Sequence, residues 1–324
     1  MDSTLRVPYK TVDKIDIPTD IYLPSPSSKP CPVLIMVHGG AFMLGHAGMN
    51  NKDQIQDSLE RGWIVLAIEH RLCPGVDVLE GPMRDVRDAL QWVQDGALAQ
   101  ILRDNQRPDC IPDGDRVVIM GTSSGGHLAL STAWDVPKRP LAILDFYGAK
   151  HFNDPFWSQP VSKMPAHFFE PLPLDEVQTL MKEKATFIGG VSLEGQAFDP
   201  SPLAPDPKAR QGFAMHHIAT GKVINAIWPS TPQGLEKIDP MLNVGAAWPP
   251  LAIVHGTADT MIPMRLSKEF ERALKETGAE VEFIEVEGEP HTFCGTMVKG
   301  SKTWATQRKG FDFLEKVVAR SYQQ

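Results

Sequence analysis

Short apolar runs alternate with amphipathic stretches along most of this 324-residue chain. Six of the runs are continuous and rich in β-forming residues. They occupy residues 32–37, 63–68, 116–120, 141–146, 250–254 and 281–286. Continuous apolar strands of this length are typical of a parallel sheet that is covered on both faces.

Amphipathic helical patterns lie between these runs. Residues 82–98, 264–277 and 302–320 carry apolar side chains at helical spacing, with charges on the opposite face. Alternation of strand and helix predicts right-handed crossovers and a doubly wound α/β fold. The segments 4–10 and 14–23 alternate apolar and polar residues more clearly, and we expect them to form an antiparallel edge.

One region lacks this alternation of strand and helix patterns. Residues 150–248 are rich in Pro, Phe, Trp and Met and show little periodicity. A segment of this length is too long for a bare loop. We therefore expect a largely helical cap inserted after the sixth strand, with residues 1–149 and 249–324 forming the core. A second small domain with its own core is the alternative.

Composition and charge argue against some partners and locations of the protein. The formal net charge is −8 and no basic stripe is present, which argues against nucleic-acid binding. No apolar run approaches roughly 18 residues, so no membrane span is expected. The N-terminus lacks the apolar stretch of a signal peptide. Four scattered cysteines have no zinc-ligand spacing, and a cytoplasmic protein with reduced thiols is expected: Cys31, Cys73, Cys110 and Cys294.

The strongest chemical motif is Gly-Thr-Ser-Ser-Gly-Gly at residues 121–126. It fits the G-x-S-x-G pattern and lies between an expected strand and an expected helix. A sharp turn there would present the hydroxyl of Ser123, and glycines on both sides would relieve the crowding. Ser123 is the predicted nucleophile. An ordinary glycine-rich turn with a helix-capping serine is the alternative.

A serine nucleophile requires a base, and in this motif's usual context the acid and then the base follow it along the chain. His291 follows the last expected strand and is the predicted base, ahead of His216 and His217 in the insertion. Loops at the carboxyl ends of parallel strands are where catalytic groups gather.

The predicted acid is Asp259, which lies in the segment 255–263 just after the run 250–254. Asp145 also ends a core strand, but that strand precedes the insertion, so it is the second choice. Asp199 and Asp239 lie inside the insertion and do not follow a core strand.

A Gly-Gly pair follows the first apolar run. Acyl transfer builds negative charge on the carbonyl oxygen, and each preorganised N–H donor stabilises it by about 3–4 kcal/mol. Gly39, Gly40 and Ala41 are expected to contribute such donors, together with Ser124 after the nucleophile. His38 is expected to hold this loop rather than to react, and Cys294 to pack near the site.

An aromatic insertion favours an apolar substrate pocket. Phe42, Trp157 and Phe168 are the candidate pocket residues. No metal or organic cofactor is implied by any spacing of ligand-type residues.

These motifs resemble those of carboxylesterases of the hormone-sensitive-lipase type and of related short esterase-like α/β hydrolases. The resemblance covers residues 31–148 and 249–320 and includes the segment His-Arg-Leu-Cys-Pro at 70–74. It implies the α/β-hydrolase fold with a mostly parallel eight-stranded sheet and helices on both faces. The chain departs from the family at Ala41, where a third glycine is usual, and at Thr122 and Ser124, where Asp and Ala are usual.

The leading hypothesis is a serine hydrolase that cleaves a carboxylic ester or lactone of a small apolar molecule through an acyl-serine intermediate. A peptidase or amidase, and a thioester or C–C bond hydrolase of a biosynthetic pathway, use the same triad. A receptor of the hydrolase fold that binds a small molecule without turnover is the alternative of another class. The expected partner is a small-molecule ester, and a homodimer is possible.

Overall fold

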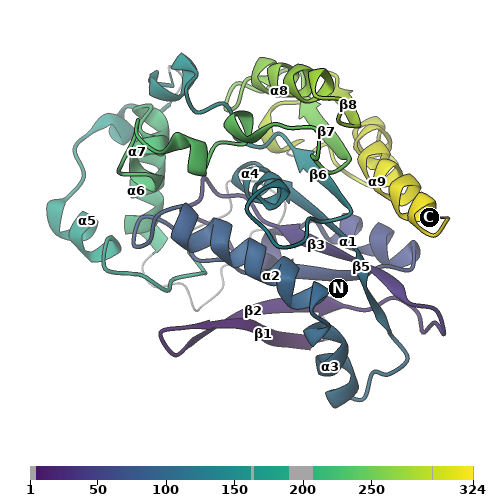
Figure 1. The fold of residues 1–324 in the computed structure, drawn as a ribbon. Coiled ribbons are helices and arrows are strands. Elements are labelled where there is room, and N and C mark those ends of the chain that lie inside the picture. Colours follow the sequence, from purple (N-terminus) through teal and green to yellow (C-terminus); the bar gives the residue numbers. More distant parts are fainter. Residues whose placement is uncertain (1–4, 162–163, 190–206, 294, 324) are drawn as a thin grey trace.

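The computed structural model describes residues 5–161, 164–189, 207–293 and 295–323. Eight strands in these ranges form one sheet in the order β1-β2-β4-β3-β5-β6-β7-β8 (Figure 1). Their bounds are β1 Leu5–Val12, β2 Ile15–Tyr22, β3 Cys31–Val37, β4 Ile64–Ile68, β5 Pro112–Thr122, β6 Ala142–Phe146, β7 Leu251–Gly256 and β8 Val281–Val286. All six apolar runs are therefore strands.

The strands are antiparallel at one edge of the sheet and parallel in the rest of it. The outer strands β1 and β2 are antiparallel, and β2 pairs with β4 in the same sense. Every other pairing, from β4 through β8, is parallel. The fully buried strand β3 lies between β4 and β5, with Ile35 opposite Leu66 and Ile119. The predictions of an antiparallel edge and a parallel centre are confirmed.

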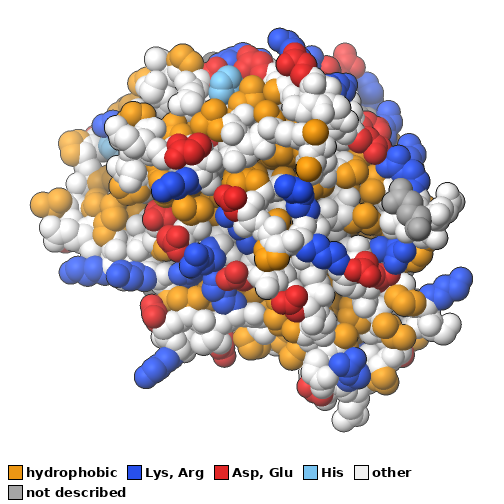
Figure 2. Space-filling view, in the orientation of Figure 1, with side chains coloured by type: hydrophobic (Ala, Val, Ile, Leu, Met, Phe, Trp, Pro, Cys, Tyr) orange, Lys and Arg blue, Asp and Glu red, His pale blue; other side chains and the backbone are white. Residues whose placement is uncertain are grey.

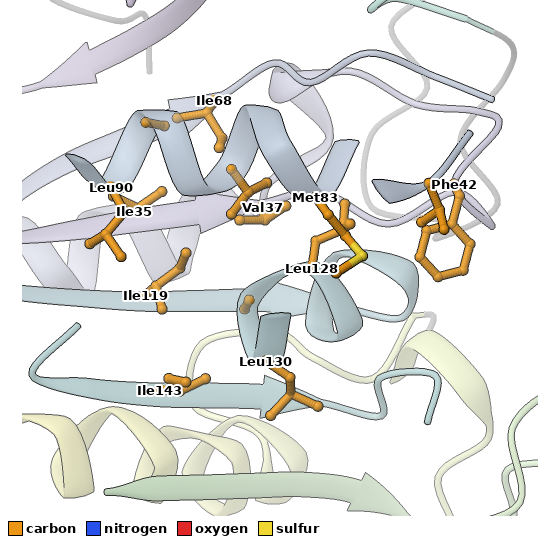
Figure 3. Packing of buried hydrophobic residues seen from close by; sticks show 14 of the residues in the cluster. Ile35, Val37, Phe42, Ile68, Met83, Leu90, Ile119, Leu128, Leu130 and Ile143 are labelled. Atoms are coloured by element: carbon orange, nitrogen blue, oxygen red, sulfur yellow. The ribbon is translucent and has the colours of Figure 1, made fainter. Parts of the chain in front are cut away.

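Helices cover both faces of the sheet. Ile35 and Val37 point to one face, where they join a cluster with helices α2 (Arg84–Gln94), α3 (Ala97–Asp104), α4 (Ser124–Leu130) and α8 (Met264–Glu276). Figure 3 shows this packing around Ile119, Leu128 and Leu90. Leu34 and Met36 point to the other face, against α1 (Lys52–Glu60) and α9 (Lys302–Ser321).

The helical pattern at 82–98 is not one helix. A π-helical turn at Leu79–Met83 leads into α2, which ends at Gln94. Gly96 then has a φ of +84°, a left-handed conformation that ends helices and that glycine adopts without a steric penalty. The chain continues as the separate helix α3.

Between β6 and β7 the described chain contains helices and turns but no strand of the sheet. They are η4 (Pro155–Ser158), η5 (Ala166–Phe169), α5 (Leu174–Leu180), α6 (Pro207–Ala219), α7 (Val223–Ile227), η6 (Leu235–Lys237) and η7 (Pro240–Asn243). Helices α5, α6 and α7 lie together at one end of the sheet (Figure 1). Phe213, Ile227 and Trp248 share a hydrophobic cluster with the sheet, so the described part of the insertion packs against the core. The division of the chain into two units stays a prediction.

Candidate active site

Ser123 occupies the turn between β5 and α4. Its backbone has φ 53° and ψ −121°, outside the regions that L-residues ordinarily adopt. The backbone N–H of Ser123 donates to the carbonyl oxygen of Phe146 at 2.9 Å, which ties the turn to the neighbouring strand β6. The serine is half-buried, at the point where the strand ends.

Glycine is required on both sides of this turn. A Cβ at Gly121 would lie 2.0 Å from the carbonyl oxygen of Gly125, and a Cβ at Gly125 would lie 2.3 Å from that of Val37. Real Cβ atoms do not approach backbone this closely. The expectation that glycines relieve crowding around Ser123 is therefore confirmed.

The structure brings Ser123, His291 and Asp259 together. His291 begins the turn η8 (His291–Phe293) after β8, and its Nε2 lies 2.9 Å from Ser123 Oγ. Its Nδ1 lies 2.7 Å from Oδ2 of Asp259, a residue of the turn that follows β7. The three residues follow three different parallel strands, whose carboxyl ends meet at one edge of the sheet.

Asp259 is held at both carboxylate oxygens. Oδ1 accepts the backbone N–H groups of Met261 and Ile262 at 2.8 and 2.9 Å. Oδ2 faces His291 and, at 3.1 Å, Nε2 of a second histidine, His255. Burial alone would raise the pKa of Asp259, but the charge of His291 and the hydrogen bonds of both imidazoles outweigh it and hold the pKa well below its usual range. The acid is therefore ionised at neutral pH.

The predicted oxyanion donors divide into two groups. Gly40, Ala41 and Ser124 line the cavity above Ser123, whereas Gly39 does not. The backbone N–H groups of these three lining residues have no acceptor among the described residues. Gly40 has a φ of +123°, and a Cβ there would lie 2.1 Å from the carbonyl oxygen of Leu44, so the loop requires glycine at this position.

His38 supports the loop rather than the reaction. Its Nδ1 hydrogen-bonds the carbonyl oxygen of Gly39 at 2.8 Å, and its ring stacks on His70 at 4.2 Å between centroids. Burial lowers the pKa of His38 well below its usual value, so the ring is neutral. This agrees with the structural role expected from the sequence.

The rival candidates have other partners. Asp145 pairs with the buried ammonium group of Lys150 at 2.7 Å. Asp239 accepts the backbone N–H groups at the start of the insertion. His216 and His217 bond backbone carbonyl oxygens. Asp199 and Cys294 lie outside the described residues.

A cavity of about 370 Å³ opens above Ser123. Phe42 and Trp157 line it, as the sequence predicts. Phe168 does not: its ring packs on His167 at 4.0 Å, and the prediction of Phe168 as a pocket residue is wrong. Its turn η5 lies outside the lining, a placement that weak periodicity could not reveal. Lining residues that the sequence did not single out include Phe156, Gln159, Val161, Met164, Met215, Ile218 and Met261.

One group of described residues has the ligand spacing of a metal site. Ligand atoms of His151, Asp154 and Glu269 lie within 4.8 Å of one another. Arg265 already bonds both carboxylates, at 2.6 Å to Asp154 and 3.4 Å to Glu269. Its guanidinium therefore supplies the positive charge that this cluster needs.

Charged side chains are interspersed over the face shown in Figure 2, where acidic and basic groups alternate with apolar patches. In the described ranges, no helix is long and apolar enough to cross a bilayer. Cys31, Cys73 and Cys110 are buried free thiols.

Comparison with known sequences identifies relatives of part and of all of the chain. Residues 19–142 match the family model BD-FAE. The chain is 32% identical to the non-reducing polyketide synthase prhL of Penicillium brasilianum, over 95% of this chain and 14% of that protein. It is 30% identical to the non-reducing polyketide synthase ascC of Acremonium egyptiacum, over 94% and 15%. The chain thus spans about one seventh of the length of these relatives.

Comparison with solved structures extends over the whole chain. A Thermogutta terrifontis esterase 2 phosphoramylated by tabun superposes with a TM-score of 0.61 at 18% identity, covering 98% of this chain and 94% of that one. A propionate-bound form of the same esterase gives 0.58 at 19% identity, covering 98% and 93%. These structures share the fold, while the family model matches the region that carries the elbow. The chain therefore has the α/β-hydrolase fold.

Proposed function

We propose that this chain is a serine hydrolase that cleaves a carboxylic ester of a small apolar molecule through an acyl-serine intermediate. The observation that carries the proposal is the unbroken hydrogen-bonded series from Ser123 through His291 to Asp259. The structural neighbours are esterases, and they and the BD-FAE match support the same reaction class.

The geometry supplies each step of acyl transfer. His291 Nε2 takes the proton of Ser123 Oγ as that oxygen bonds to the carbonyl carbon. Gly40, Ala41 and Ser124 line the cavity above Ser123, and their N–H groups are the proposed donors to the developing oxyanion. His291 then gives the proton to the departing alcohol. Water, deprotonated by the same ring, attacks the acyl-serine, and the ring returns that proton to Ser123 Oγ as the acid is released.

The cavity restricts the substrate by polarity. No Lys, Arg, Asp or Glu is among its lining residues in the described chain, and Gln159 is a neutral polar group. Aromatic rings and methionine side chains form much of the wall, and methionine adapts to irregular apolar shapes. We propose that the acyl group bound here is uncharged and apolar.

Labelling with a fluorophosphonate tests the proposal directly. The purified protein and Ser123→Ala are incubated with the probe, and the modified residue is located by peptide mass spectrometry. Modification of Ser123, absent from the variant, is expected. A p-nitrophenyl ester series from acetate to decanoate sizes the acyl pocket. A folded protein that neither labels nor hydrolyses any ester would contradict the proposal and favour a non-catalytic receptor.

An acyl thioester is the second candidate substrate. The relatives named as polyketide synthases favour it, because polyketide synthesis joins acyl units and the same triad acts on an acyl thioester by the same route. Measuring kcat/KM on matched butyryl substrates, one with a p-nitrophenol and one with an N-acetylcysteamine leaving group, distinguishes ester cleavage from thioester cleavage. A higher kcat/KM on the thioester, despite its poorer leaving group, would make thioester cleavage the primary activity. Dipeptide amides test the peptidase alternative in the same assay.

A further inference from the structure

A second histidine contacts the acid of the triad. His255 is the next-to-last residue of strand β7 and is fully buried. Its Nε2 lies 3.1 Å from Asp259 Oδ2, the same oxygen that His291 contacts, and 2.9 Å from the carbonyl oxygen of Ile262. Asp259 is thus shared by two imidazoles, of which one reaches Ser123.

Behind His255 lies a buried series of polar groups. Its Nδ1 is 2.9 Å from Oγ of Ser267 on helix α8, which is fully buried. The ammonium group of Lys150, also fully buried, donates to this Oγ at 2.8 Å. Lys150 further donates to the carbonyl oxygen of Gly148 at 2.6 Å and pairs with Asp145 at 2.7 Å.

Donor and acceptor counting fixes the direction of the series. Lys150 can only donate, so Ser267 Oγ accepts from it and retains one hydrogen to give. His255 Nε2 faces two acceptors and must carry a proton, which leaves Nδ1 of a neutral ring to accept from Ser267. Every bond then points from Lys150 through Ser267 and His255 toward Asp259, and each of these buried groups has a partner.

We propose that Lys150, Ser267 and His255 form a positioning relay that holds the carboxylate of Asp259 oriented toward His291. This inference rests on the proposed serine-hydrolase function. His255 does not reach Ser123 or the cavity lining, so it acts only through Asp259. The second N–H donor on Oδ2 restricts the carboxylate to the orientation in which the same oxygen accepts from His291.

The relay makes a specific prediction about the catalytic rate. Of the described residues, the titratable groups that face the two rings are Asp259 and Tyr147, with Lys150 and its partner Asp145 one step behind. Removing His255 or Ser267 is expected to lower kcat roughly ten- to a hundredfold, the loss that corresponds to one hydrogen bond to a charged group. KM should change less than about twofold, since neither side chain lines the cavity.

Three variants and one control test this. Ser267→Ala and His255→Leu break the relay, whereas His255→Gln keeps an N–H donor near the position of Nε2. Ser58→Ala is the matched control, because Ser58 is another fully buried helical serine whose Oγ bonds a carbonyl oxygen, that of Gln54 at 2.8 Å. The readout is the rate of Ser123 labelling by a fluorophosphonate from pH 5 to 9, together with kcat and KM on the best ester.

The relay predicts slower labelling and a lower kcat in Ser267→Ala and His255→Leu, with substantial recovery in His255→Gln. Folded Ser267→Ala that labels like Ser58→Ala at every pH would overturn it. Absence of labelling in the parent protein would instead refute the hydrolase function itself, so the two failures are distinguishable.

A spectroscopic measurement needs no activity. With 15N-labelled histidine, and His255→Gln to assign the signals, the relay requires a neutral His255 protonated at Nε2 at pH 7.5. A proton on Nδ1, or a doubly protonated ring at that pH, would contradict the proposed direction of the bonds.

Discussion

At the scale of single residues, the site depends on backbone conformations that few side chains tolerate. Ser123 and Ala41 both have positive φ, at 53° and 54°, and the loop requires glycine at Gly40. Departures from the usual family residues at Thr122 and Ser124 leave this geometry in place. The hydroxyl of Ser124 is nevertheless buried and has no hydrogen-bond partner among the described residues.

Ser124→Ala is expected to raise the free energy of unfolding by about 1 kcal/mol, because it removes a buried hydroxyl that lost its water without gaining a partner. Urea denaturation measures the change. Ser131→Ala is the matched control: Ser131 is equally buried, but its Oγ donates to the carbonyl oxygen of Leu128 at 2.7 Å. That variant should lose about 1 kcal/mol. Equal losses in both variants would refute the interpretation.

At the scale of elements, one buried side chain ties the insertion to the oxyanion loop. Arg210 on helix α6 is 2% exposed. Its Nη1 donates to the carbonyl oxygens of Met43 and Cys73 at 3.1 and 2.7 Å, and its Nη2 pairs with Glu183. Met43 lies two residues beyond Ala41, so the insertion helps to hold the loop that we propose supplies the oxyanion donors.

Arg210→Met should therefore lower both stability and kcat. Losing hydrogen bonds to a charged group costs roughly 2–3 kcal/mol, and the loop is no longer held. Urea denaturation and ester hydrolysis measure the two effects. Arg265→Met is the control, since Arg265 is half exposed and its pair with Asp154 should contribute less than about 1 kcal/mol. An Arg210→Met protein as stable as Arg265→Met would contradict the role assigned to this side chain.

At the scale of the whole molecule, buried titratable groups set how stability changes with pH. Burial lowers the pKa of His127 to about 3, and it lowers that of His38 and His70 as well. Burial acts in the opposite sense on Glu69, where it raises the pKa to about 7 despite the nearby Arg6. The histidines favour the folded state at neutral pH, whereas protonation of Glu69 favours it in acid.

The directions of these pKa shifts predict how the free energy of unfolding depends on pH. Between pH 6.5 and 3 the unfolded chain binds a proton at His127 that the folded chain does not, so stability falls as pH falls, by about 1.4 kcal/mol per pH unit. Between pH 7 and 4.5 Glu69 contributes the opposite slope. Burial also lowers the pKa of His217 and raises that of Asp239, which makes four histidines against two carboxyl groups. The parent protein should therefore lose stability as the pH falls from 6.5 to 4.5.

Two variants separate these contributions. His127→Asn keeps a donor for the carbonyl oxygen of Ala149, which His127 Nδ1 contacts at 2.9 Å, but it cannot titrate. Its unfolding free energy should fall less steeply in acid than that of the parent protein, and that of Glu69→Gln more steeply. Unfolding by urea at pH 4.5, 5.5 and 6.5 measures the slopes. Parallel slopes in all three proteins would be inconsistent with these assignments.

The sequence by itself determined the six core strands, the elbow at Ser123 and the order of Ser123, Asp259 and His291. Strand periodicity and turn chemistry depend on residues a few positions apart, and parallel strands bring their carboxyl ends to one edge, so these features follow from local pattern. Only the tertiary structure decided that Phe168 lies outside the cavity and that Ser267 links Lys150 to His255. Lys150 and Ser267 are 117 positions apart. Which side chains meet over such a separation depends on how whole helices pack on the sheet, and no local pattern contains that information.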